Sequence, residues 1–409
     1  MNKNWKKWGV SLLGAVFVAG AVWGSSAAPS AKAATSQASQ FTDVKSTHWA
    51  YSAVQQGVAK GYVDGYTNGT FKPDASVTRA EFVKMVVAAM KLDVKETSGK
   101  WYIPYVDAAT NKGLYEANDF ANAEAAWNKV MTRDEMARVA ARAIGETSKE
   151  DDKWMYLASK TGLIQGVGKG QIAPEGLTTR AQAVVIIERI LSKSAGQDLN
   201  VDRYAVGAAE ILWHGTNIFT VMPEKFATPE SDWKNKGKSS VEEMWNEKAM
   251  TLTSNDGLYQ SKLDALVAID MADPNDPNRA LLGDINTLKW FNNNYNVKNL
   301  MVKNQKDTYV LYFKSTQVFN KDKTKYLNKP FAQFEVRGFN SPDIKEFFAG
   351  TLNKTARVYR NEVGDVPATI LPKRGTVQGL SDILIMLQTP TDAKNLYKEV
   401  DLLRMRGLN

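Results

Sequence analysis

The chain has 409 residues, of which 44% are hydrophobic and 23% charged, so it is long enough for two or three domains with sizeable cores. It has no cysteine and only two histidines, His48 and His214, which excludes disulfides and zinc–thiolate sites and argues against Ser-His or Cys-His catalysis. The net charge is +8, but the basic residues form no dense cluster, so no nucleic-acid partner is predicted.

Residues 1–33 are typical of an export signal. Basic residues precede an apolar run from Trp8 to Gly24, and Ala31-Lys32-Ala33 offers a small-x-small cleavage site. The run is short and interrupted by glycines, so we expect cleavage near Ala34 rather than a retained membrane anchor. Four of the 52 basic residues lie in residues 1–33, which carry no acid, so the mature chain has 48 basic residues against 44 acidic ones.

One short motif occurs three times in the first half of the chain. Apolar residues follow its arginine at +3, +6, +7, +10 and +11, which is one face of an α-helix. Threonine at the start, with Glu or Gln three residues later, predicts a capping box. The three copies are Thr78-Arg79-Ala80-Glu81, Thr132-Arg133-Asp134-Glu135 and Thr179-Arg180-Ala181-Gln182.

A shorter helical segment precedes each motif and ends at Gly61, Gly113 and Gly162. Trp49 and Trp101 lie at the same spacing before the first two of these glycines. Glycine-rich loops join the two helices in the first and third copies, at 65–73 and 166–174, whereas the second copy has lost this loop. A unit with one apolar face cannot cover that face alone, so we expect the three units to pack together.

These segments resemble the S-layer homology motif. The resemblance rests on Phe41-Thr42-Asp43-Val44, His48-Trp49-Ala50, the 65–73 loop and the Thr-Arg-Ala-Glu motif. It predicts repeats at 41–94, 95–146 (degenerate) and 147–194, then a linker at 195–202 and an uncharacterised domain at 203–409. It implies an all-α pseudo-threefold bundle whose grooves bind a secondary cell-wall polymer attached to peptidoglycan, often one with a pyruvylated amino sugar.

The repeated arginine suggests why such a motif could bind an anionic sugar. A cation at the first helical position is unfavourable because it lies at the positive end of the helix dipole. Three arginines at this position therefore indicate a role other than helix stability. A guanidinium beside a helix N-terminus can meet the carboxylate of a pyruvate ketal with two hydrogen bonds. The predicted carbohydrate-binding residues are Arg79, Arg133, Arg180, Trp49, Asp43, Gly65, Gly69, Gly166 and Gly170.

Structural roles are the alternative for several of these residues. The arginines could bridge repeats through Asp or Glu, Trp49 could belong to the core, and Asp43 could cap the helix that begins near Trp49.

The second half resembles no family that we recognise. Helices are predicted near 203–213, 257–269, 342–350 and 391–406, and strands at 309–313, 332–337 and 357–359. The predicted fold class is therefore multidomain: an all-α bundle of three repeats, followed by an α+β or mainly β domain.

No catalytic residue, cofactor or metal is predicted in either half. His214 is a lone histidine, and Glu242, Glu243 and Glu247 read as a solvated helix face. The oxygen-rich loop at 270–284 lacks EF-hand spacing, so calcium binding there is left open.

The predicted function is non-enzymatic anchoring of an exported protein at the cell wall or S-layer of a bacterium. Binding of the wall polymer needs no membrane span after signal cleavage, and self-assembly at the surface is left open. An anchored cell-wall or polysaccharide hydrolase and an anchored solute-binding protein are the alternatives, because the second half carries no recognised motif.

Overall fold

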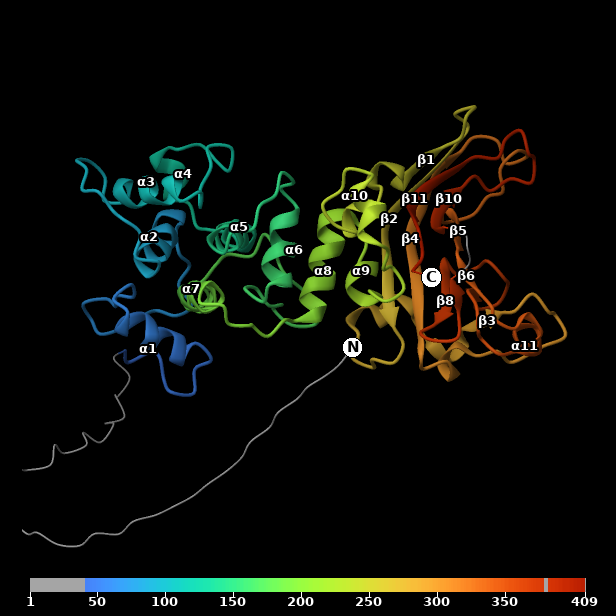
Figure 1. Cartoon of the computed structure of the whole chain (residues 1–409), viewed down its shortest axis with the longest axis horizontal. Coiled ribbons are helices and arrows are strands. Elements are labelled where there is room, and N and C mark those ends of the chain that lie inside the picture. Colours follow the sequence, from blue (N-terminus) through green and yellow to red (C-terminus); the bar gives the residue numbers. More distant parts are fainter. Residues whose placement is uncertain (1–40, 379–381, 409) are drawn as a thin grey trace, which may run out of the picture.

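The computed structural model describes residues 41–378 and 382–408, so the predicted signal peptide and cleavage site lie outside the described residues. Helices dominate the first half and antiparallel sheets the second (Figure 1). The helices of the first half are α1 (Tyr51–Ala59), α2 (Arg79–Ala89), α3 (Ile103–Asn111), α4 (Glu124–Trp127), α5 (Arg133–Ala143), α6 (Lys153–Lys160) and α7 (Arg180–Ser194).

Helices α2, α5 and α7 begin at the three repeated arginines. Each starts with a complete capping box, in which the N-cap threonine side chain accepts a hydrogen bond from the amide of the third helical residue, and the side chain of that residue accepts one from the N-cap amide. The pairs are Thr78/Glu81, Thr132/Glu135 and Thr179/Gln182. All three N-cap residues have extended backbone, so the chain enters each helix as a short extended segment.

These three extended segments pair with one another in a closed ring of backbone hydrogen bonds. The amide of Val77 donates to Thr178 (3.0 Å), that of Thr178 to Met131 (2.8 Å), and that of Met131 to Val77 (2.9 Å). The three residues are fully buried or nearly so, and buried amides need partners. The ring therefore ties the starts of the three long helices together.

The predicted all-α pseudo-threefold bundle is wrong as a description of the fold. The helical half is closed by paired extended segments, because an N-cap threonine requires extended backbone whose amides must then bond elsewhere. The other half contains a multi-strand antiparallel sheet.

Six strands form the main sheet of the second half, in the order β1-β2-β4-β8-β7-β3. A three-stranded sheet, β11-β10-β5, and a two-stranded sheet, β6-β9, complete the strand pairing of the described residues. The strands are β1 (Thr251–Thr253), β2 (Tyr259–Asp270), β3 (Lys289–Phe291), β4 (Thr308–Asn320), β5 (Gln333–Arg337), β6 (Phe339–Asn340), β7 (Ala356–Tyr359), β8 (Ala368–Pro372), β9 (Val377–Gln378), β10 (Ile383–Gln388) and β11 (Glu399–Met405).

Helical segments lie around these sheets. The α-helices are α8 (Arg203–His214), α9 (Ile218–Val221), α10 (Glu230–Lys234) and α11 (Ile344–Ala349), and the 3₁₀ helices are η1 (Glu242–Met244), η2 (Glu247–Met250), η3 (Pro277–Leu282), η4 (Ile285–Thr287) and η5 (Val302–Asn304).

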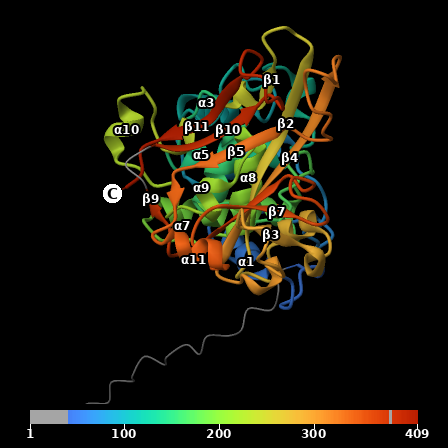
Figure 2. The ribbon, with the colours of Figure 1, turned by 90° about the vertical axis from the view of Figure 1, so that its right-hand side faces the viewer.

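The main sheet is covered on both faces. One core contains Phe313 and the three-stranded sheet, and Phe313 stacks on Phe334 of β5 (3.8 Å between ring centroids). The other contains Trp290 and Phe347 of α11. Figure 2 shows β10, β11 and β5 lying across the long strands β2 and β4.

The helices predicted at 257–269 and 391–406 are wrong, because these residues contain β2 and β11. In β2, a register shift at Asp264 interrupts the alternation, and the residues after it are buried because cores cover both faces of the sheet. In β11, a register shift leaves neighbouring Leu402 and Leu403 both buried. A bulge removes the period of two by which a strand is recognised in a sequence.

Helix α8 packs against α6, so the two halves share one core. Trp213 of α8 lies against Tyr156 (5.0 Å between ring centroids) and donates a hydrogen bond to Glu150 (2.6 Å). The first core accordingly extends from Phe41 to Trp213. Figure 1 shows α6 and α8 side by side between the helices and the sheets. The division into domains at 195–202 stays a prediction.

None of the helices in residues 41–378 and 382–408 is both long and apolar enough to cross a membrane.

Candidate functional site

Three grooves lie between the repeated units, and each contains one of the three arginines. We name each groove after its arginine: the Arg79, Arg133 and Arg180 grooves have volumes of about 350, 390 and 260 Å³. Each groove also contains the third residue of the next helix around the ring. This residue is Glu135 beside Arg79, Gln182 beside Arg133, and Glu81 beside Arg180.

In the Arg79 groove, the arginine side chain is already bound by other protein groups. Arg79 forms an ion pair with Glu135, donates to the carbonyl oxygen of Ala126 (3.0 Å) and lies over the ring of Phe120 (4.2 Å). Its side chain is only 12% exposed. Arg79 therefore bridges α2 and the second unit, as the structural alternative proposed.

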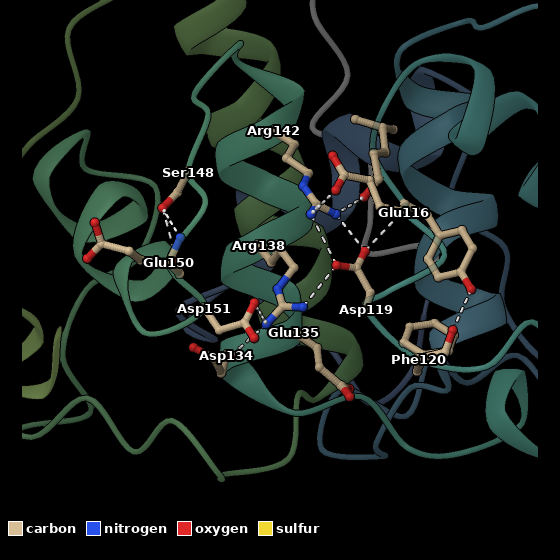
Figure 3. Close-up of polar contacts among 12 residues, drawn as sticks. Glu116, Asp119, Phe120, Asp134, Glu135, Arg138, Arg142, Ser148, Glu150 and Asp151 are labelled. Carbon is tan, nitrogen blue, oxygen red and sulfur yellow. Dashed lines mark hydrogen bonds and ion pairs between the residues drawn. The ribbon is translucent and has the colours of Figure 1, made fainter. Parts of the chain in front are cut away.

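Carboxylates outnumber arginines in the Arg79 groove. Asp119, Asp134, Glu135 and Glu175 line it together with Arg79 and Arg138. Asp119 lies between Arg138 and Arg142 and accepts hydrogen bonds from both (Figure 3). Burial raises the pKa of Asp119, but these hydrogen bonds outweigh burial and lower it. Burial raises the pKa of Asp134 to about 6. An anionic ligand would meet repulsion here.

The Arg133 groove has the opposite charge. Arg133 and Arg189 both line it, and none of its described lining residues is a carboxylate. Arg133 is 5% exposed and donates from Nε to the carbonyl oxygen of Ile172 (2.9 Å) and from Nη2 to that of Gln165 (2.9 Å). Arg189 donates to the carbonyl oxygen of Leu163 and to the Gln165 side chain. Among the described residues, neither arginine has a carboxylate partner.

Burial and the neighbouring Arg189 lower the pKa of Arg133, and burial lowers that of Arg189. Both shifts mean that the positive charges are poorly compensated by the protein. An anion that entered the groove would supply the missing charge.

An exposed tryptophan lines each of the two less acidic grooves. Trp49 is 63% exposed at the Arg133 groove, so it does not belong to the core. Trp101 is 52% exposed at the Arg180 groove, with Lys84 6.0 Å from its ring centroid. The candidate residues predicted from the sequence do not include Trp101, Lys84 or Arg189. The equal spacing of Trp49 and Trp101 before their glycines was the signal that could have found Trp101.

The Arg180 groove is electrically balanced. Arg180 and Lys84 line it together with Asp64 and Glu81. Arg180 donates from Nε to the carbonyl oxygen of Phe71 (2.7 Å) and from Nη2 to that of Asp64 (2.8 Å). It thus holds the glycine-rich loop of the first unit.

Other residues predicted to bind carbohydrate lie at the glycine-rich loop of the first unit or in the Arg133 groove. Asp43 caps no helix; its carboxylate accepts the amides of Phe71 (2.8 Å) and Lys72 (2.7 Å), which fixes the loop. Gly65 packs against the ring of Phe41, and Gly69 turns the loop with a positive φ. Gly166 lines the Arg133 groove.

Gly170 faces the second half of the chain instead of a groove. A Cβ atom there would lie 2.5 Å from the Pro277 side chain, and its φ of +69° also favours glycine.

The polar residues singled out in the second half lie in structural contacts. His214 is buried beside Glu210 and stacks on Trp213. Glu242 is buried and not solvated, because it accepts hydrogen bonds from Tyr156 (3.0 Å) and Lys160 (2.7 Å) of α6. In the 270–284 loop, Asp270 forms an ion pair with Lys373 (2.7 Å). Within the described residues, no group of three or more potential metal ligands is found.

Comparison with known proteins gives one family match and several relatives. The S-layer homology domain profile matches residues 40–83 and 149–184. The chain is 33% identical over 183 residues to the exoglucanase XynX of Acetivibrio thermocellus, which covers 38% of this chain and 16% of that protein.

Two other relatives are named after a surface layer and after anchoring. The surface-layer 125 kDa protein of Lysinibacillus sphaericus is 28% identical over 202 residues, 43% of this chain and 17% of that protein. A cellulosome-anchoring protein of Acetivibrio thermocellus is 32% identical over 85 residues, 18% of this chain and 19% of that protein. The chain thus spans less than a fifth of the length of each of these relatives. The first half of this chain contains S-layer homology domain sequence, at residues 40–83 and 149–184.

Proposed function

We propose that the first half anchors this protein to the cell wall by binding an anionic secondary cell-wall polymer, with the Arg133 groove as the principal site. One observation carries the proposal: Arg133 and Arg189 share a groove that has no lining carboxylate within residues 41–378 and 382–408 and is flanked by exposed Trp49. The S-layer homology sequence and the surface-layer and anchoring relatives support a location at the cell wall or cell surface.

The chemistry of the groove suits a sugar that carries a carboxylate, such as a pyruvate ketal. A guanidinium binds a carboxylate through charge-assisted hydrogen bonds, which are stronger than neutral ones. Two of the three guanidinium nitrogens of Arg133 already bind carbonyl oxygens, which holds the group in place and leaves Nη1 for a ligand. The flat face of Trp49 can pack on the apolar face of a sugar ring.

The charge of each groove ranks the three sites. The Arg133 groove has two cations and no carboxylate, the Arg180 groove has two of each, and the Arg79 groove has two cations and four carboxylates. We therefore propose that the Arg180 groove contributes more weakly, through Lys84 and Trp101, and that the Arg79 groove serves to hold the units together.

The second half, residues 203–409, is proposed to be a surface or accessory module carried by this anchor. Its hydrogen bonds to the first half would hold the sheets in a fixed position relative to the anchor.

Sedimentation with purified cell-wall sacculi tests the proposed function. The full chain should sediment with sacculi that keep their anionic polymer and stay in solution with sacculi from which the polymer has been extracted. Equal sedimentation with both preparations would contradict the proposal, because peptidoglycan itself would then be the ligand.

A further inference from the structure

The second half contains a polar cavity of about 420 Å³, far from the three grooves. It lies beside β5, which is the edge strand of the three-stranded sheet. Strands β8, β7 and β3 of the main sheet lie on its other side. Phe291, Arg357 and Thr369 are register partners on β3, β7 and β8, so their side chains share one face of the sheet and form one wall. Residues 334–340 form the opposite wall. The volume is in the range of small-molecule sites.

Several polar side chains of this cavity have no partner among the described residues. Arg357 makes no hydrogen bond or ion pair there, and the amides of Asn293 and Asn340 are likewise unbonded. The Thr355 hydroxyl is buried and also lacks a hydrogen-bond partner. Buried polar atoms are nearly always bonded, so the Thr355 hydroxyl points to a ligand or water in the cavity. Arg357, Asn293 and Asn340 are exposed, so their side chains are accessible to a ligand from solvent.

The charge of the lining favours an anion. Arg337, Lys354 and Arg357 line the cavity, and Glu335 is its one carboxylate among the described residues. Arg337 already binds both oxygens of Glu335 (2.8 and 2.7 Å). Arg357 also attracts Glu335 and helps to lower its pKa, but three cations face one carboxylate, so the lining keeps a net positive charge. Glu335 would repel a doubly charged group more strongly than a single carboxylate.

Aromatic rings make up the apolar part of the site. Phe291 lines the cavity and contacts Tyr295 (4.9 Å between ring centroids), a residue that is 72% exposed and lies beside the lining. Exposed aromatic rings beside amide and hydroxyl groups are suited to a sugar, which has one apolar face and a rim of hydroxyls.

We propose that this cavity is a second binding site, independent of the anchor, for a saccharide that carries a carboxylate. Arg357 and Lys354 bind the carboxylate, Asn293, Asn340 and Thr355 bind hydroxyl or amide groups, and Phe291 contacts the sugar face.

N-acetylmuramic acid and N-acetylglucosamine are a matched pair of probes, because they differ only in the carboxylate-bearing lactyl group. Saturation-transfer NMR is measured on the full chain with the Gln182→Glu change, which places a carboxylate in the Arg133 groove and reduces binding at that groove. The Arg357→Gln change then reports on the second site alone. N-acetylmuramic acid should bind and N-acetylglucosamine should not. Adding Arg357→Gln should weaken binding at least about tenfold.

Two further variants separate a binding role from a structural one. Arg374→Gln changes an exposed arginine outside the cavity and should leave binding unchanged. Glu335→Gln removes the repelling carboxylate and should tighten binding, which no loss of structure would do. Equal binding of both sugars, equal binding of inorganic phosphate, or full binding by the Arg357→Gln variant would overturn the proposal.

Discussion

Arg79 and Glu135 form an ion pair across the contact between α2 and α5, while Glu135 also accepts the amide of Thr132 at the start of its own helix. Gln182 holds the equivalent place beside Arg133 and makes the same capping box without a charge. The residue at this place is therefore one of the differences between a groove whose arginine is in an ion pair and one whose arginine has no carboxylate partner among the described residues.

Loss of the Arg79 side chain should destabilise the fold and leave polymer binding nearly unchanged. Arg79→Ala leaves Glu135 in a partly buried groove without its ion-pair partner, which should cost about 2 kcal/mol of unfolding free energy. Thermal melts measure this loss. Lys100→Ala is the control, because the Lys100–Glu124 pair is exposed to solvent and should contribute little to stability. Weaker polymer binding with an unchanged melting temperature would show that Arg79 contacts ligand instead.

The exposed tryptophans should contribute to binding and not to stability. Trp49→Ala should weaken polymer binding about tenfold and leave the melting temperature almost unchanged, because Trp49 is largely exposed. Trp101→Ala should weaken it less. Trp127 is the matched control: it is 1% exposed, so its replacement by alanine should cost about 3–5 kcal/mol. A large fall in stability with Trp49→Ala would place this residue among the structural ones.

Acid should loosen the contact between the two halves. Burial raises the pKa of Glu242, but attraction to Lys160 and hydrogen bonds outweigh it and lower the pKa to about 2, from 4.5. A lowered folded-state pKa stabilises the fold above the unfolded-state value, and this contribution is lost as the pH falls from about 4.5 toward 2.

Thermal melts between pH 7 and pH 2 test this linkage. Glu242→Gln should lower the melting temperature at pH 7. Below pH 4.5, the melting temperature of this variant should fall less steeply with pH than that of the wild type. If the variant and the wild type lose stability in parallel below pH 4.5, Glu242 does not link the halves.

The starts of the three long helices could be predicted from the sequence, whereas the backbone hydrogen bonds that join these starts could not. Capping boxes and the apolar spacing are local signals, and they locate the starts of α2, α5 and α7. The ring that joins Val77, Met131 and Thr178 depends on backbone groups, about which side-chain patterns say nothing.

The charge of each groove could not be predicted from the sequence either. It depends on residues from separate units, such as Arg189 and Gln182 beside Arg133. In the second half, register shifts hid β2 and β11, because a bulge breaks the alternation that marks a strand.

The Gln182→Glu variant tests the central claim most directly. Glutamate keeps the capping box, so the fold should be unchanged, but it places a carboxylate beside Arg133 as Glu135 lies beside Arg79. Glu135→Gln is the matched control in the other groove. In titrations with purified wall polymer, Gln182→Glu should weaken binding at least about tenfold, or about 1.4 kcal/mol, and Glu135→Gln should not weaken it. Unchanged affinity of a folded Gln182→Glu variant would contradict the assignment of the Arg133 groove as the principal site.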